Sequence, residues 1–114
     1  MNPFETAKAL FLRAIDHLQK EEWEEAEVWL RQSLQLVPDR PSTLNNLAAA
    51  LLKLKKFEEA QEVMQKVLSV DRNMASAWVN QATLLNQLAR HDEALQSCDR
   101  AIELEPDSAE AHHS

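Results

Sequence analysis

Cys and His, the side chains whose chemistry is most readily used near neutral pH, are few, because the chain of 114 residues holds one Cys and four His. His17 follows Asp16 and His91 precedes Asp92. Residues that are next to each other in a helix do not face each other, so neither pair forms an acid–base couple. No Ser–His–Asp arrangement stands out that would activate a nucleophile. We therefore predict no catalytic residue and no enzyme activity.

Thiol and metal chemistry have equally little support. Cys98 lies in an apolar helical pattern without an evident electropositive partner, so we expect a core residue rather than a nucleophile. His112 and His113 are adjacent and have no third ligand, which makes a poor metal site. We predict no metal and no cofactor.

The chain contains no Gly, and this excludes whole classes of site. Phosphate and dinucleotide loops need Gly so that the backbone can approach the ligand, and hairpin-rich β folds need it for turns with positive φ. Ala, Leu, Glu, Lys and Arg make up roughly half of the residues, which is the composition of long helices. Any site should therefore be positioned by helices.

Charge and Cys content limit the partners and the compartment. The formal net charge of −7 disfavours nucleic acid, because phosphate binding needs a basic face. The longest segment without a charge, 73–89, is too short and too polar to span a membrane. One Cys excludes an internal disulfide and favours a reducing compartment, and the N-terminal residues show no signal-peptide pattern. We expect a cytoplasmic protein.

A spacing of 34 residues repeats along the chain. It relates small residues at two positions of each unit: Ala14, Ala48 and Ala82 at the 8th, and Ala26, Ala60 and Ala94 at the 20th. Each unit holds two segments in which apolar residues follow the helical period, and the small side chains let the two helices approach closely. We predict one all-α domain over 1–114, with helix hairpins at 7–40, 41–74 and 75–108. The segment 109–114 should start a further helix.

The expected helix starts follow the same spacing. Asp39, Asn73 and Asp107 share the 33rd position and are predicted to cap the helices that follow them. Asn2 before Pro3 has the pattern of an earlier N-cap, so the first helix should start about one turn before residue 7.

A 34-residue helix–turn–helix unit with small residues at these two positions resembles the tetratricopeptide repeat. The third unit is the most similar, with Trp78, Ala82, Ala94, Ala101 and Pro106 at family positions. The resemblance implies a right-handed α-solenoid of three antiparallel hairpins, whose first helices line a concave groove that commonly binds extended peptides. The chain departs from the family where the turn after the first helix often has Gly; here it has Glu21, Lys55 and Ala89.

By this resemblance we assign a groove set, defined as the predicted peptide-contacting residues of the three first helices. It comprises Lys8, Phe11, Leu12 and Ile15; Asn45, Asn46, Ala49 and Lys53; and Ser76, Val79, Asn80, Thr83, Asn86 and Gln87. Asn46 and Asn80 share the 6th position, and a column of such amides can hold a peptide backbone without reading its side chains. The alternative is that both are solvated surface residues.

The charge divides between the two kinds of helix. The first helices, 7–20, 41–55 and 75–88, have net charges of +2, +2 and 0, whereas the second helices, 22–36, 57–70 and 91–105, have −3, −2 and −4. This division predicts a neutral or acidic extended segment as the ligand, steered by Lys8 and Lys53. Simple solvation of outer faces by acidic residues is the alternative explanation.

One specific ligand is not expected. Tetratricopeptide domains that grip the C-terminal carboxylate of heat-shock chaperones use Lys, Asn, Asn, Lys and Arg at five positions. Here those positions hold Phe11, Ile15, Asn46, Ser76 and Asn80, so one of five matches. We predict that the chain has no such carboxylate clamp.

The function we predict is a non-catalytic protein-interaction scaffold. One alternative is the substrate-recruiting N-terminal arm of a larger enzyme, such as a bacterial glycosyltransferase or methyltransferase. Another is a structural module that self-associates through its C-terminal end, because a repeat array needs a polar cap there. The face that would then lack cover contains Val79, Leu84, Leu88, Leu95 and Cys98.

Overall fold

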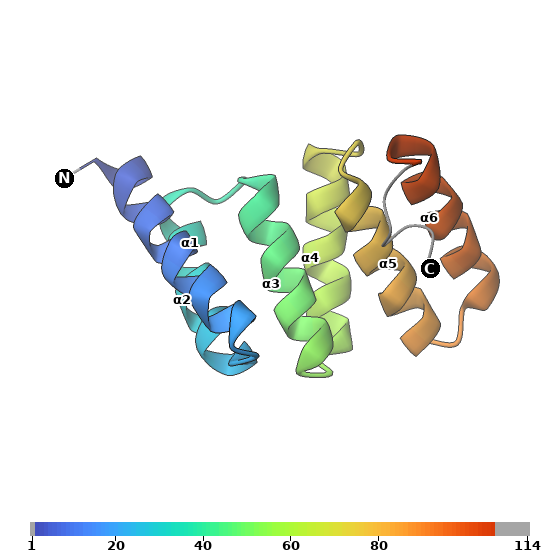
Figure 1. The fold of residues 1–114 in the computed structure, drawn as a ribbon, viewed down its shortest axis with the longest axis horizontal. Helices are drawn as coiled ribbons and strands as arrows, with labels where there is room; N and C mark the ends of the chain where they lie inside the picture. The colour runs from blue at the N-terminus through green and yellow to red at the C-terminus, as the bar shows by residue number, and fades with distance from the viewer. Residues whose placement is uncertain (1, 107–114) are drawn as a thin grey trace.

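The computed structural model describes residues 2–106. Its helices are α1 Pro3–Gln19, α2 Trp23–Leu36, α3 Pro41–Lys53, α4 Phe57–Val70, α5 Ala75–Gln87 and α6 His91–Leu104. No strand occurs within the described residues. The helices form three hairpins, α1 with α2, α3 with α4 and α5 with α6, which stand side by side in a row (Figure 1). The prediction of an all-α solenoid of helix–turn–helix repeats is confirmed.

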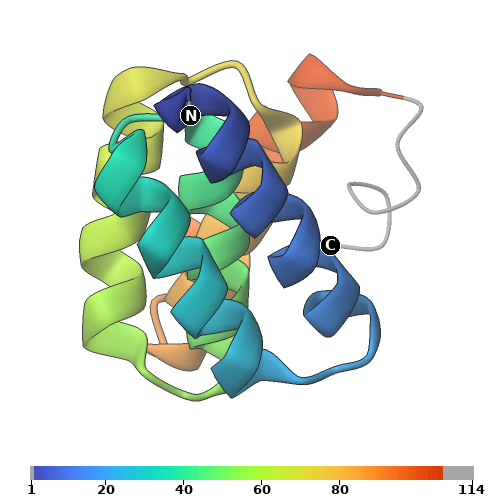
Figure 2. The ribbon, with the colours of Figure 1, turned by 90° about the vertical axis from the view of Figure 1, so that its left-hand side faces the viewer.

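Contacts between neighbouring hairpins hold the row together. α3 packs against α2, and α5 packs against both α4 and α3. Figure 2 looks along the row from its N-terminal end and shows α1 and α2 as the nearest pair, with the other hairpins behind them. In a stack of this kind each hairpin buries its apolar face only against its neighbours. The contacts at the junctions between hairpins therefore hold the three repeats together as one domain.

The small residues at the 8th and 20th positions are buried as predicted. Ala14, Ala48 and Ala60 have no exposed surface, and Ala82 and Ala94 are also buried. The buried residues form a large cluster, which extends from α1 to α5, and a small cluster between α5 and α6. Cys98 belongs to the small cluster, which confirms its prediction as a core residue.

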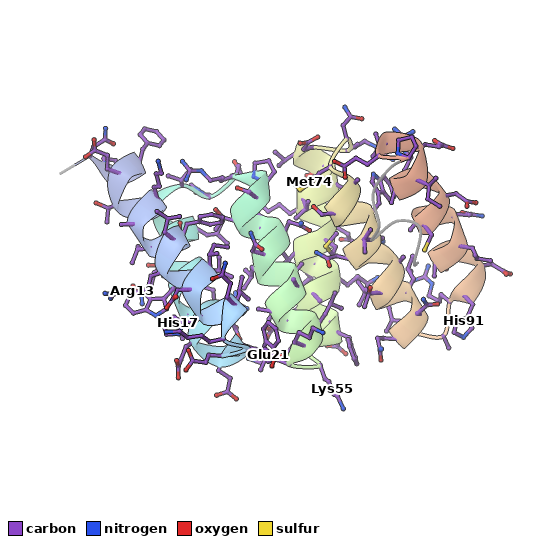
Figure 3. All side chains as sticks on the ribbon, in the orientation of Figure 1. Arg13, His17, Glu21, Lys55, Met74 and His91 are labelled. Carbon is purple, nitrogen blue, oxygen red and sulfur yellow. The ribbon has the colours of Figure 1, made fainter. Side chains whose placement is uncertain are left out.

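The turns inside the three hairpins share one backbone conformation without Gly. Glu21, Lys55 and Ala89 have φ values of 59°, 62° and 62°. Figure 3 shows Glu21 and Lys55 at the same lower edge of the array. In each turn the next N–H reaches back to the helix, as Glu22 does to the carbonyl of His17 at 2.9 Å. This is the Schellman motif, whose left-handed residue is usually Gly because a Cβ costs about 1 kcal/mol there.

The start of α1 agrees with the sequence. Asn2 Oδ1 accepts the N–H of Phe4 at 2.8 Å, and Pro3 occupies the first helical turn. The predicted caps at Asp39 and Asn73 are wrong by one residue. Arg40 and Met74 occupy the N-cap positions, and neither side chain bonds to the helix end.

Asp39 and Asn73 have other roles. The carboxylate of Asp39 pairs with Lys66 Nζ at 3.3 Å. The backbone N–H of Asn73 donates to Asp71 Oδ1 at 2.9 Å inside the turn before α5. Neither side chain caps a helix, because Asp39 reaches α4 and because the polar side chain that bonds in the turn before α5 is that of Asp71.

The expectation of an uncovered C-terminal face is correct only in part. Leu84 is buried in the large cluster and Cys98 in the small one, so that part of the expectation is wrong. Leu88 and Leu95 are exposed, Leu95 to 61%. Leu95 lies in α6, after which the structure describes no further hairpin, whereas Leu88 lines a pocket together with Lys55 and Phe57 of the second hairpin.

Some predictions concern residues that the structure does not describe. Asp107, His112, His113 and the further helix expected at 109–114 lie outside the described residues. Within residues 2–106, no helix is both long and apolar enough to cross a membrane.

Candidate functional site

The groove set lies on α1, α3 and α5, and its members differ in burial. Seven side chains are exposed, namely Lys8, Leu12, Lys53, Ser76, Thr83, Asn86 and Gln87. Six are half-buried, namely Phe11, Ile15, Asn46, Ala49, Val79 and Asn80. Asn45 is buried, with 8% of its surface exposed. Phe11 also packs against the large core cluster, so the apolar end of the groove set is partly an extension of the core.

Three members of the groove set meet at the junction of the second and third hairpins. Asn45 Nδ2 donates to Ser76 Oγ at 3.1 Å. Asn80 Nδ2 donates to Asn45 Oδ1 at 2.8 Å. A buried amide without partners costs about 1–3 kcal/mol, so these bonds are needed for Asn45 to be buried. The network joins α3 to α5 and fixes the position of Asn80.

Asn46 and Asn80, the two Asn residues at the 6th position, each use the side-chain nitrogen in a hydrogen bond and leave the side-chain oxygen without one in the described part of the chain. Asn46 Nδ2 donates to the carbonyl of Ser42 at 2.9 Å, within its own helix. Asn80 Nδ2 donates to Asn45. Among the described residues, neither Asn46 Oδ1 nor Asn80 Oδ1 has a hydrogen-bond partner. Each half-buried amide therefore presents an acceptor that a peptide N–H would fit.

Other polar members of the groove set bond to their own surroundings. Thr83 Oγ1 donates to the carbonyl of Val79 at 3.1 Å. Asn86 Oδ1 accepts a hydrogen bond of 3.0 Å from His91 Nδ1, across the turn between α5 and α6. Asn86 thus stabilises the turn, and the exposed Gln87 is the freer amide at that end.

One cation in each of the first two hairpins lies against a Trp ring. Lys53 Nζ is 5.7 Å from the ring centre of Trp23. Arg13, which is not in the groove set, lies 4.8 Å from the ring centre of Trp29. Such contacts contribute about 0.5–1 kcal/mol at exposed sites and hold the cation in place. Lys8 is exposed and forms no ion pair among the described residues.

A cluster that sequence reasoning missed lies at the first turn. His17 Nδ1 is 2.9 Å from Glu22 Oε1 and 3.2 Å from Glu25 Oε2. One nitrogen and two carboxylate oxygens this close are a conceivable cation site. The hydrogen bond to Glu22 already accounts for the geometry, because it spans the left-handed turn at Glu21. The carboxylate next to His17 in the sequence is that of Asp16, which does not face it in the helix.

A network of ion pairs closes the junction of the first two hairpins. Glu27 Oε1 bonds Lys56 Nζ at 2.9 Å, and Glu27 Oε2 bonds Arg31 Nε at 2.8 Å. Arg31 also bonds Glu59 Oε2 at 3.0 Å, which ties α2 to α4. Burial raises the pKa of Glu27, but the hydrogen bonds from Lys56 and Arg31 outweigh it and leave the pKa below its ordinary value.

The comparisons with known proteins agree with this geometry. A family model described as tetratricopeptide repeat matches residues 5–73. This chain belongs to the tetratricopeptide repeat family. A second tetratricopeptide repeat model matches residues 45–109, so the two models together span all three hairpins. No curated protein sequence matches the chain.

Solved tetratricopeptide structures share the fold. The tetratricopeptide domain of Arabidopsis OM64 is 22% identical with a TM-score of 0.92, over 97% of this chain and 92% of that one. The second such domain of human RPAP3, in complex with an HSP70 peptide, is 22% identical with a TM-score of 0.86, over 97% and 92%. The Thermobaculum terrenum O-GlcNAc transferase is 23% identical with a TM-score of 0.93, over 98% of this chain but only 22% of that one.

Proposed function

We propose that this tetratricopeptide repeat chain is a non-catalytic protein-interaction scaffold that binds an extended peptide along α1, α3 and α5. The repeats would be 7–40, 41–74 and 75–108, and the compartment the cytoplasm. Tetratricopeptide repeats are generally protein-binding modules, and a structural neighbour of this chain is in complex with an HSP70 peptide. The observation that carries the proposal is the pair of acceptor atoms, Asn46 Oδ1 and Asn80 Oδ1, 34 residues apart and without partners among residues 2–106.

The proposed ligand is a neutral to acidic segment bound through its backbone. The two Oδ1 atoms would accept peptide N–H groups, and the exposed Lys8 and Lys53 would attract carboxylates at one end. The half-buried Phe11 and Ile15 would contact an apolar side chain there. Four of the five carboxylate-clamp residues are absent, so we propose an internal segment rather than a free C-terminus.

Peptide selection followed by calorimetry tests this proposal. Peptides selected from a random library are titrated into the wild-type chain, the Asn46→Ala variant and the Asn73→Ala variant. We expect Asn46→Ala to weaken binding about tenfold, the loss of one hydrogen bond of about 1.4 kcal/mol. Asn73 is an exposed turn residue and serves as the matched control. If the selected peptides bind the Asn46→Ala/Asn80→Ala variant as tightly as the wild type, peptide binding by these two side chains is excluded.

Two other functions have a specific observation behind each. The structural match to the O-GlcNAc transferase favours an arm of a larger enzyme, which a glycosyltransferase- or methyltransferase-like domain in the flanking reading frame would reveal. The exposed Leu88 and Leu95 favour self-association. Sedimentation of the wild type and the Leu95→Lys variant at high concentration distinguishes this, because only the wild type should associate.

A further inference from the structure

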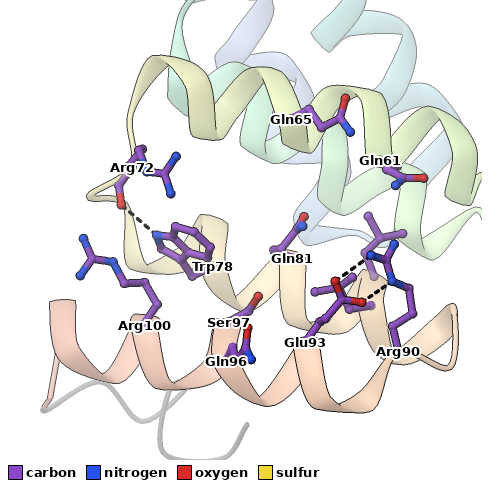
Figure 4. Close-up of a pocket in the computed structure, with 12 residues that line it drawn as sticks. Gln61, Gln65, Arg72, Trp78, Gln81, Arg90, Glu93, Gln96, Ser97 and Arg100 are labelled. Atoms are coloured by element: carbon purple, nitrogen blue, oxygen red, sulfur yellow. Dashed lines mark hydrogen bonds and ion pairs between the residues drawn. The ribbon is translucent and has the colours of Figure 1, made fainter.

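A pocket of about 460 Å³, apart from the groove set, lies between α4 and α6 over one face of α5 (Figure 4). Its α5 residues include Trp78, Gln81 and Leu85, which recur at the helical period and so share a face. Val79 and Thr83 of the groove set are about half a turn away from Gln81. No lining residue belongs to the groove set. The pocket is therefore separate from the predicted groove.

The floor of the pocket is polar where the preceding junction is apolar. Gln81 and Ser97 occupy the positions that hold Leu47 and Val63 34 residues earlier. Leu47 is buried in the large core cluster and Val63 packs against it. Gln81 Oε1 is buried and has no hydrogen-bond partner among the described residues. An unpartnered buried acceptor costs about 1–3 kcal/mol, which a ligand N–H would recover.

The ion pairs that close the first junction have no counterpart at the second. Lys56 bonds Glu27 across the first junction at 2.9 Å. The residues 34 positions later are Arg90 and Gln61, so the carboxylate is missing. Arg90 bonds Glu93 instead, with Nη2 and Oε1 2.7 Å apart. Glu93 lies in the first turn of α6 next to Arg90, so this pair joins nothing to α4.

A second ion pair of the first junction is also replaced, at the second junction, by an ion pair within α6. Lys66 bonds Asp39 at the first junction, at 3.3 Å. The equivalent residues are Arg100 and Asn73, and Arg100 bonds Glu103 within α6 at 3.1 Å. As a result, no ion pair joins α4 to α6 in the described part of the chain. The junction is left open, with guanidinium groups beside it.

The pocket is positive although the chain is acidic. Three Arg side chains line it, and the only carboxylate is Glu93. Arg72 has no ion pair within residues 2–106, and its guanidinium lies 5.8 Å from the ring centre of Trp78. The indole Nε1 donates to the carbonyl of Arg72 at 2.8 Å, which fixes the ring beside it. Figure 4 shows Arg72 and Arg100 near Trp78 at one end of the pocket.

We propose that this pocket is a second peptide site, which takes an acidic side chain and the adjoining backbone of a partner polypeptide. The carboxylate would lie between Arg72 and Arg100, where guanidinium groups favour planar carboxylates. A backbone N–H of the same segment would donate to Gln81 Oε1. The volume lies within the range of about 300–1,000 Å³ that ligand pockets occupy. The chain would then bind partners on two separate surfaces.

Filling the pocket tests the proposal. The Gln81→Leu/Ser97→Val variant restores the residues of the first junction at both positions. A fluorescein-labelled peptide of alternating Ala and Glu is titrated by fluorescence anisotropy, with the matched Ala and Gln peptide as control. The titrations use a Lys8→Gln/Lys53→Gln background, which removes the cations of the groove set. In that background we expect the unfilled pocket to prefer the Glu peptide about tenfold at low salt, and the filled variant to lose that preference. Arg72→Gln, which removes charge without filling the pocket, should also lose most of it.

Two further measurements complete the test. Thermal unfolding must show the filled variant folded, and Gln35→Ala, an exposed change on α2 outside both the pocket and the groove set, must keep the preference. The indole ¹⁵N–¹H signal of Trp78 should move during the titration while those of Trp23 and Trp29 stay in place. The proposal is overturned if the filled variant binds as the unfilled chain does, if the Trp78 signal does not move, or if neither peptide is preferred.

Discussion

Asn80 of α5 donates a hydrogen bond of 2.8 Å to the side chain of Asn45 of α3. The bond joins the second hairpin to the third, and Asn45 in turn donates to Ser76. The sequence assigns both Asn45 and Asn80 to peptide binding, but the contact gives them a part in the architecture. A variant of either residue therefore tests the fold as well as the ligand.

Replacing Asn45 by Ala should destabilise the chain. The change removes the buried Nδ2 donor that bonds Ser76 Oγ and leaves Asn80 Nδ2 without its Oδ1 acceptor, so we expect the free energy of unfolding to fall by about 1–3 kcal/mol. Urea denaturation followed by circular dichroism measures it. Asn46→Ala is the matched control, because Asn46 bonds only within its own helix. Its effect should stay within about 0.5 kcal/mol, and equal effects of the two variants would contradict the network.

Introducing Gly at the left-handed turns should stabilise the chain, which is the reverse of the usual effect of Gly. Ala89 has a φ of 62°, where a Cβ is strained. We expect Ala89→Gly to raise the free energy of unfolding by about 0.5–1 kcal/mol, because relief of strain exceeds the added chain entropy. Ala9→Gly, in the exposed interior of α1, should lower it by a similar amount. Thermal unfolding of both variants decides the sign.

Glu27 should make stability depend on pH. Its side chain is 12% exposed, and although burial raises its pKa, the bonds from Lys56 and Arg31 lower it below the ordinary value. A carboxyl whose pKa is lower in the folded state stabilises above its unfolded pKa, and that contribution is lost as pH falls through the folded pKa. We expect Glu27→Gln to lose about 1 kcal/mol near neutral pH and little at pH values well below 4.

Denaturant titrations at several pH values measure this difference between the two chains. The gap between wild type and Glu27→Gln should close as the solution becomes acidic. Gln61→Glu is the matched gain-of-charge variant, because it places a carboxylate opposite Arg90 at the second junction. It should widen the stability difference between neutral and acidic solution. A gap for Glu27→Gln that is constant with pH would contradict the ion-pair network.

Enlarging a small residue between the helices should disrupt a hairpin. Ala60 has no exposed surface where α3 and α4 approach each other. Ala60→Leu would overpack this contact and should cost about 1–3 kcal/mol. Ala9→Leu adds the same atoms on an exposed part of α1 and should be nearly neutral. The urea denaturation midpoints of the two variants measure this difference in stability. Equal midpoints would mean that α3 and α4 can move apart to accommodate the larger side chain without a loss of stability.

The sequence by itself determined the helices and their pairing, because both depend on local spacing. Apolar residues at the helical period and Ala at the 8th and 20th positions of each 34-residue unit are enough to predict close-packed hairpins. Ala48 and Ala60, for example, had to be buried however the hairpins were stacked. The cap of α1 followed from Asn2 in the same way, because a capping bond lies within a few residues.

The tertiary structure alone decided which side chains meet across hairpins. Asn45 and Asn80 form a hydrogen bond because α5 packs against α3. The spacing of residues within one helix does not predict a contact between two different hairpins. His17 reaches Glu22 only because Glu21 adopts a left-handed turn. The pocket over Gln81 is likewise lined by residues of two hairpins, and only their stacking brings these residues together. These features depend on how the hairpins stack, and stacking is set by many weak contacts that the repeat pattern leaves unspecified.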